Sequence, residues 1–172
     1  MSAMIPSAVA AILDRDLRAL RRELDAYPDD RTVWAEPPGF PNSAGTLILH
    51  IAGNLQHYVG AVLGGTGYVR DRPAEFARRD VPRAELLDDI ERARVAVRST
   101  LDRLAPDVLG HEYPEAVAGA RVRTGDYLIH LCAHLTYHLG QVDVHRRVMT
   151  GSGGGIGAVQ AAEIGRAERA PV

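Results

Sequence analysis

The stretch that decides the fold is His130-Leu-Cys-Ala-His134-Leu-Thr-Tyr-His138-Leu-Gly-Gln141. Its leucines recur at the spacing of one helix face, which predicts an amphipathic helix packed on a core. His134 and His138 are four residues apart, so on a helix they lie about 6 Å apart along the axis and about 40° apart around it. The two imidazoles are therefore expected at the rim of the packed interior, where they can hold one metal ion.

A second stretch, Leu47-Ile-Leu-His50-Ile-Ala-Gly-Asn54, repeats this arrangement. Its apolar residues form another helical stripe, and His50 and Asn54 lie on the flank of that stripe. If both stripes share one core, His50 converges with His134 and His138. Zinc in a catalytic site takes three protein ligands and keeps a fourth position for water, so the set has the right count. The alternative is that the histidines are ordinary hydrogen-bonded residues and no metal binds.

The composition is that of one globular domain. The chain has 172 residues, 46% of them hydrophobic, which is enough for a substantial core. A formal net charge of -2 predicts neither a nucleic-acid partner nor an anionic membrane surface. Every basic residue is an arginine, which excludes lysine Schiff-base chemistry. The single cysteine, Cys132, excludes an internal disulfide. Because no signal peptide or membrane-spanning run is recognisable either, we expect a cytoplasmic protein.

Hydrophobic periodicity predicts four long helices, and therefore an all-α four-helix bundle. The helices are expected at about residues 6–27, 44–63, 82–104 and 124–149. The proline-rich residues 28–42 are expected to form a loop in which Trp34 and Phe40 cap the core or, alternatively, line the mouth of a pocket. Residues 106–123 should be a long loop or a hairpin-like connection.

Two further predictions concern the ends of the chain and its possible ligands. Residues 1–150 are expected to form the bundle, and residues 151–172 a glycine-rich linker with a weakly helical tail over 158–168. Arg70 and Arg72, in the connection after the second helix, could hold a carboxylate or phosphate of a small ligand. Alternatively, they pair on the surface with their acidic neighbours Asp71, Glu75 or Asp80. Gln141, one turn after His138, is a candidate for hydrogen bonding to a metal-binding imidazole.

These motifs together resemble the DinB/YfiT-like proteins, a family of metal-binding four-helix bundles. The resemblance extends over residues 5–149. It rests on Leu49-His50-Ile-Ala-Gly-Asn54, His134-x-x-x-His138-Leu-Gly-Gln141 and, between them, Arg70-Asp-Arg72-x-x-Glu75-Phe76. It implies an up-down-down-up bundle, a metal site at His50, His134 and His138, zinc or nickel as the ion, and a homodimer.

The resemblance also implies classes of activity. Some family members resemble transferases or isomerases that use a low-molecular-weight thiol such as bacillithiol, mycothiol or glutathione. We therefore expect a metal-dependent enzyme for a small-molecule substrate, with such a thiol as cosubstrate and with Arg70, Arg72 and Asn54 as ligand contacts. One alternative is a metal-dependent hydrolase, in which the ion activates water. Another is a non-catalytic stress-response bundle, in which Asn54 or His57 closes the fourth metal position.

Overall fold

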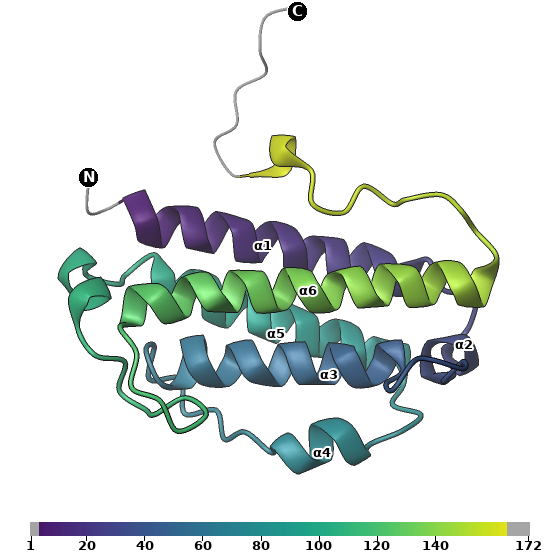
Figure 1. The fold of residues 1–172 in the computed structure, drawn as a ribbon, viewed down its shortest axis with the longest axis horizontal. Coiled ribbons are helices and arrows are strands. Elements are labelled where there is room, and N and C mark those ends of the chain that lie inside the picture. Colours follow the sequence, from purple (N-terminus) through teal and green to yellow (C-terminus); the bar gives the residue numbers. More distant parts are fainter. Residues whose placement is uncertain (1–3, 165–172) are drawn as a thin grey trace, which may run out of the picture.

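A computed structural model describes residues 4–164 of the chain (Figure 1). Within this range the regular structure is helical and there are no strands, which confirms the all-α class. Two isolated antiparallel bridges make the 106–123 connection hairpin-like. The α-helices are α1 (Met4–Asp25), α2 (Asp30–Trp34), α3 (Ala44–Leu55), α4 (Arg72–Ala77), α5 (Arg83–Leu101) and α6 (Thr124–Thr150). A π-helical segment, η1 (Gln56–Ala61), and two 3-10 turns, η2 (Pro106–Gly110) and η3 (Ala161–Glu163), complete them.

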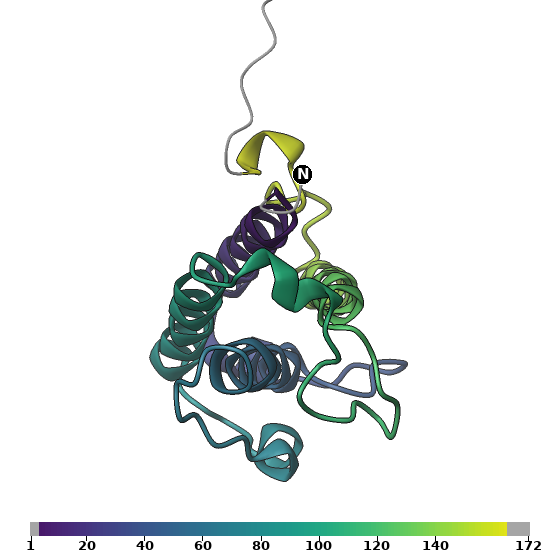
Figure 2. The same ribbon diagram turned by 90° about the vertical axis from the view of Figure 1, so that its left-hand side faces the viewer.

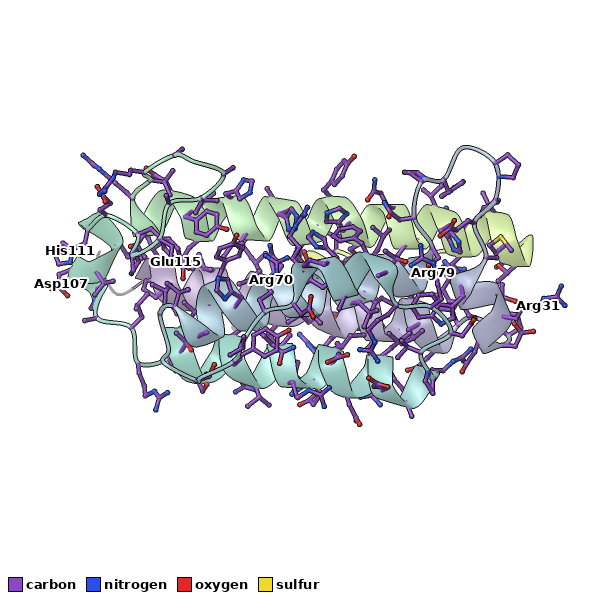
Figure 3. All side chains as sticks on the ribbon, turned by 90° about the horizontal axis from the view of Figure 1, so that it is seen from below. Arg31, Arg70, Arg79, Asp107, His111 and Glu115 are labelled. Atoms are coloured by element: carbon purple, nitrogen blue, oxygen red, sulfur yellow. The ribbon has the colours of Figure 1, made fainter. Side chains whose placement is uncertain are left out.

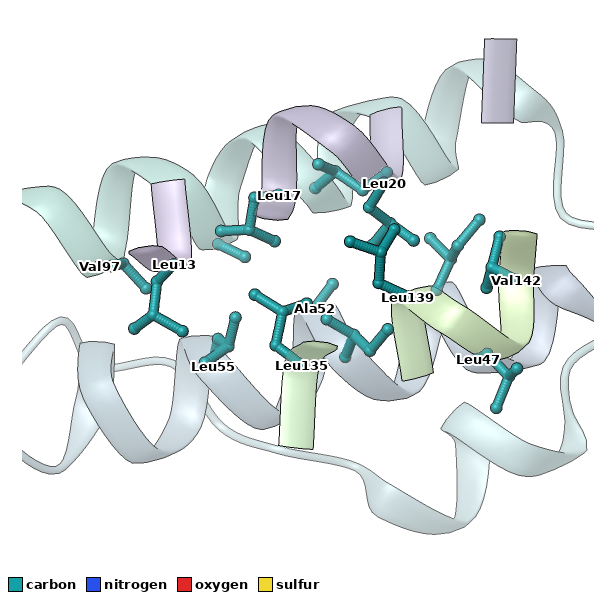
Figure 4. Close-up of a cluster of buried hydrophobic side chains, with 14 of the residues drawn as sticks. Leu13, Leu17, Leu20, Leu47, Ala52, Leu55, Val97, Leu135, Leu139 and Val142 are labelled. Atoms are coloured by element: carbon teal, nitrogen blue, oxygen red, sulfur yellow. The ribbon is translucent and has the colours of Figure 1, made fainter. Parts of the chain in front are cut away.

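The four long helices α1, α3, α5 and α6 lie side by side around one core. The end view shows them at the corners of a four-sided arrangement, with α4 outside α3 (Figure 2). Helix α1 contacts α5 and α6, and α3 contacts the same two helices. All four contribute to the central apolar cluster (Figure 4), whose members include Leu13, Leu17, Leu20, Leu47, Leu55, Val97, Leu135, Leu139 and Val142.

Helix α3 is the most enclosed element of the fold. All of its residues are buried, because α4 covers the side that the other long helices leave open. It begins where the hydroxyl of Ser43 accepts a hydrogen bond from the backbone N–H of Thr46, which satisfies one of the free N–H groups of the first turn. The last helix, α6, ends at Gly151, whose φ of 67° is the left-handed conformation that glycine adopts without strain.

Three predicted segments differ from the structure. Residues 28–42 are not all loop, because they contain the short helix α2, which Asp29 caps. Trp34, the last residue of α2, is buried, and its indole N–H donates to the carbonyl of Val81. The connection that carries Arg70 contains α4, and α3 continues as a π-helix where an α-helix was predicted. Helices as short as α2 and α4 show no apolar periodicity in the sequence, since they make only one or two turns.

The segment after α6 turns back along the outer side of α1 (Figure 1). Arg22 holds it there, donating to the carbonyl of Gly157 and pairing with Glu163, while Arg18 donates to the carbonyl of Glu163. Only the turn η3 is helical in the described part of the predicted tail helix, and its remainder, 165–168, lies outside the described residues. No helix within residues 4–164 has the length and apolar character needed to cross a membrane.

Candidate metal centre

Three histidines from two helices meet at the interface between α3 and α6. The ligand nitrogens of His50, His134 and His138 all lie within 4.8 Å of one another. Nε2 of His134 is 3.4 Å from Nε2 of His50 and 3.2 Å from Nε2 of His138. The rings stand nearly perpendicular to one another, and His50 is only 7% exposed. Packing of the two apolar stripes on one core therefore brings the three imidazoles to one point.

The outer nitrogens of two of these rings contact oxygen acceptors. Nδ1 of His50 lies 3.0 Å from Oε2 of Glu75, and Nδ1 of His138 lies 2.7 Å from Oε1 of Gln141. A carboxylate only accepts hydrogen bonds, so Nδ1 of His50 carries the proton, and the amide oxygen imposes the same tautomer on His138. Each Nε2 therefore presents its lone pair to the cluster, as metal-binding histidines do.

Glu75 is held in place by an arginine and by a close backbone approach. It comes from α4, is 6% exposed, and accepts from Arg70 at 2.7 Å (Nε to Oε1) and 2.9 Å (Nη2 to Oε2). Burial raises the pKa of Glu75, but the hydrogen bonds from His50 and Arg70 outweigh it and leave the pKa below its usual value. A Cβ atom at Gly53 would lie 2.1 Å from Oε1 of Glu75, so only glycine allows this approach.

The imidazoles of His134 and His138 are electrically neutral near pH 7. Burial, together with the neighbouring His138 and His50, lowers the pKa of His134 to about 4. Burial also lowers the pKa of His138, despite the hydrogen bond to Gln141. Neutral imidazole is the form that binds metal ions, because the protonated ring has no free lone pair.

The two arginines predicted to bind a ligand lie in different environments. Arg70 is near the middle of the bundle, far from His111 at one end (Figure 3). It pairs with Glu75, as the alternative prediction held, but the pair is buried and not on the surface. Arg72 is exposed, with its guanidinium 5.1 Å from the centre of the Phe76 ring. A ligand-binding role of either arginine stays a prediction.

The other candidates near the centre differ in their partners. Asn54 is buried one turn after His50, and its Oδ1 has no hydrogen-bond partner within residues 4–164. Nε2 of His57 lies 3.0 Å from a carboxylate oxygen of Glu115, so this side chain is engaged elsewhere. His130 is exposed and stacks on Tyr127. None of the three belongs to the histidine cluster found within the described residues.

The contribution of Glu75 to the site was not predicted from the sequence. Glu75 was expected only as a surface partner of the arginines and as part of the Arg70–Phe76 family motif. Two signals could have identified it. Gly53 lies inside the His50 motif, where the absence of a side chain allows a close approach, and Glu75 lies within one turn of Asp71, which caps α4. Neither signal says that α4 lies over α3.

The comparisons with known proteins give a family but no individual relative. The sequence model of the DinB superfamily matches residues 12–142, which include all three histidines, Arg70, Glu75 and Gln141. Comparison with curated proteins and with solved structures gave no significant match. Because the match covers most of the chain, the protein belongs to the DinB superfamily.

Proposed function

We propose that the protein binds one divalent metal ion, zinc or nickel, through Nε2 of His50, His134 and His138 and uses it to act on small molecules. The observation that carries this proposal is the spacing of the three nitrogens. Two nitrogens bound to zinc at 2.0–2.1 Å in tetrahedral geometry lie about 3.3 Å apart. The separations of 3.4 Å and 3.2 Å from His134 agree with that value.

The proton count supports the same proposal. His50 and His138 donate through Nδ1 to Glu75 and Gln141, so both present an Nε2 lone pair to His134. His134 has one Nε2 and can donate at most one proton, and therefore it satisfies only one of its two close contacts. The other contact brings two lone pairs together, an arrangement that a cation among the three nitrogens stabilises.

We propose further that the reaction is an S-transfer that uses a low-molecular-weight thiol. His50, His134 and His138 would hold the ion, and the ion would supply Lewis-acid chemistry that lowers the pKa of a bound thiol. The thiol must come from a cosubstrate, since burial raises the pKa of Cys132, the only cysteine, to about 11. The side chains of Glu75 and Gln141 would orient the imidazoles throughout.

Three related features are part of the proposal. Contact between α3 and α5 supports an up-down-down-up order, because parallel neighbours need a long connection and residues 62–82 provide one that contains α4. A thiol cosubstrate fits a reducing, cytoplasmic compartment. The homodimer stays a prediction.

Elemental analysis of the purified, untagged full chain tests the metal proposal. We expect about one zinc or nickel per chain, lost in His50→Ala, His134→Ala and His138→Ala. His111→Ala is the matched control, because His111 is exposed at the end of the bundle and its loss should leave the metal content unchanged. Absence of metal from the parent protein after reconstitution, or equal metal in all variants, refutes the assignment.

A kinetic experiment then tests the reaction class. The metal-loaded protein is mixed with 1-chloro-2,4-dinitrobenzene and, in turn, with glutathione, mycothiol or bacillithiol. Conjugation that needs one of these thiols, and that falls to background in His134→Ala, supports the transferase. Metal-dependent hydrolysis of simple esters without any thiol would point to the hydrolase instead, and neither activity would leave a metal-binding bundle.

A further inference from the structure

A groove of about 500 Å³ lies beside the histidine cluster. One wall is the loop of residues 39–42, with Phe40 and Pro41, and the other is the outward face of α6, with Tyr137 and Val144. Leu47 of α3 also lines it. The volume falls within the range of small-molecule sites, roughly 300–1,000 Å³.

The groove and the histidine cluster share residues. Gln141 lines the groove, and its Oε1 is the acceptor for Nδ1 of His138. Tyr137 also lines the groove, and its ring centre is 5.3 Å from that of His138. The amide nitrogen of Gln141 has two N–H donors, and no side chain or backbone group within residues 4–164 accepts a hydrogen bond from them. The junction between groove and cluster therefore offers unused donors.

The lining of the groove favours an uncharged, apolar occupant. It includes no charged side chain, whereas Tyr137 and Val144 are 65% and 50% exposed. Large apolar side chains so exposed on one helix face gain free energy when a ligand covers them. Gly140 lies between them along α6, and no atom lies within 4 Å of the position its Cβ would take, so the groove has room there.

The loop that forms one wall is fixed from behind by a buried histidine. His145 is fully buried, its Nε2 lies 2.9 Å from the carbonyl oxygen of Ala35, and the edge of its ring contacts Phe40 at a centroid distance of 5.5 Å. Its Nδ1 lies 2.7 Å from the hydroxyl of Tyr27, which donates to it. These contacts hold the wall in place, so a ligand need not order the loop when it binds.

We propose that this groove binds the apolar, uncharged body of the substrate, an aryl or alkyl carbonyl compound. Its carbonyl oxygen accepts a hydrogen bond from the amide of Gln141, and its reactive end reaches His134 and His138. The proposal rests on the proposed function, because the histidine cluster must be the reactive centre. It names the substrate class that the cluster receives: an apolar carbonyl compound, as opposed to an anionic or sugar-like one.

Binding of two simple amides to the full chain tests the groove. The probes are 4-phenylbutanamide and butanamide, which share the carbonyl acceptor and differ in the aryl group. Titrations of the ¹⁵N-labelled protein are followed by NMR at the side-chain amide of Gln141 and the backbone amide of Gly140, with and without bound metal. We expect 4-phenylbutanamide to bind at least tenfold more tightly than butanamide and to shift both signals.

Two matched variants show where the probe binds. Gly140→Leu fills the open space in the groove and should weaken binding of 4-phenylbutanamide at least tenfold; it should also fold, because glycine is unfavourable inside a helix. Ala133→Leu changes the same exposed face of α6 outside the groove and should leave the affinity unchanged. Equal affinities for the two amides, or no effect of Gly140→Leu, overturn the proposal.

Two further outcomes separate this proposal from others. If sedimentation shows a dimer that Gly140→Leu dissociates, a second copy of the chain occupies the groove and the ligand proposal is wrong. If the probes fail to bind while elemental analysis finds one metal per chain, the groove proposal fails and the metal centre stands. If 4-phenylbutanamide binds as expected to a chain that never holds metal, the groove binds ligands and the proposed function is the part that fails.

Discussion

Replacing Gly53 by alanine should destabilise the protein although it favours the helix. Gly→Ala inside a helix ordinarily stabilises by about 0.5–1 kcal/mol. Here the new Cβ would lie 2.1 Å from Oε1 of Glu75 and 2.9 Å from its Cδ, so the carboxylate must move. Moving it breaks its hydrogen bonds to His50 and Arg70 in a buried site, and separating a buried ion pair costs about 3–5 kcal/mol. We expect a net loss of about 2–4 kcal/mol in the free energy of unfolding.

The assay is urea unfolding followed by circular dichroism in the presence of EDTA, so that metal affinity does not contribute. Gly140→Ala is the control, because Gly140 also lies inside a helix but its Cβ would meet no atom within 4 Å. It should raise the free energy of unfolding by about 0.5–1 kcal/mol. The same glycine-to-alanine substitution is thus expected to lower the free energy of unfolding at Gly53 and to raise it at Gly140.

A double-mutant cycle isolates the cause. In a Glu75→Ala background no carboxylate opposes the new methyl group, so Gly53→Ala should become neutral or stabilising. The resulting coupling energy should be about 3–5 kcal/mol. A coupling energy near zero, or a Gly53→Ala variant as stable as Gly140→Ala, would show that Glu75 is not packed against this glycine and would remove the proposed support of His50.

Two other predictions concern buried ionisable groups. The pKa of His134 is about 4 in the folded protein and 6.5 in the unfolded chain, so between these pH values the unfolded state binds more protons and metal-free protein should lose stability as pH falls from about 6.5 to 4. Urea titrations should find this pH dependence of stability reduced in His134→Ala. A parent protein whose stability does not change over this range would contradict the prediction. Arg146 is buried against Glu23, so Arg146→Ala should lower the free energy of unfolding by about 3–5 kcal/mol at pH 7. The deficit should shrink in acid as Glu23 is protonated, and an Arg146→Ala variant as stable as the parent would refute the pairing.

The sequence predicted what depends on local spacing. The leucines around His134 recur once per turn, which is sufficient to predict α6, and the four-residue spacing of His134 and His138 fixes their relative position on any helix. Convergence with His50 followed from one further assumption, a shared core. The hydrophobic effect enforces that assumption, since neither stripe can stay in water.

What could not be predicted depends on the path of a connection. Glu75 reaches His50 only because residues 62–82 carry α4 across α3, and no periodicity in so short a helix indicates where it packs. The pairing of Arg70 follows from the same path, because α4 brings Glu75 to it as a buried partner and not as a surface one. The groove likewise depends on the loop at Phe40, which is positioned by His145, the residue of α6 that follows the groove-lining Val144.

The complete burial of α3 has a consequence for how the protein is made. A helix with no exposed side cannot be stable in water before its neighbours surround it, and α6, which carries His134 and His138, is synthesised after the other three long helices described. His50 is synthesised 84 residues ahead of His134, so its imidazole emerges long before the other two. The three histidines can therefore meet only after α6 has been synthesised and has packed against α3, so the order of synthesis makes the cluster one of the last features of the fold to form.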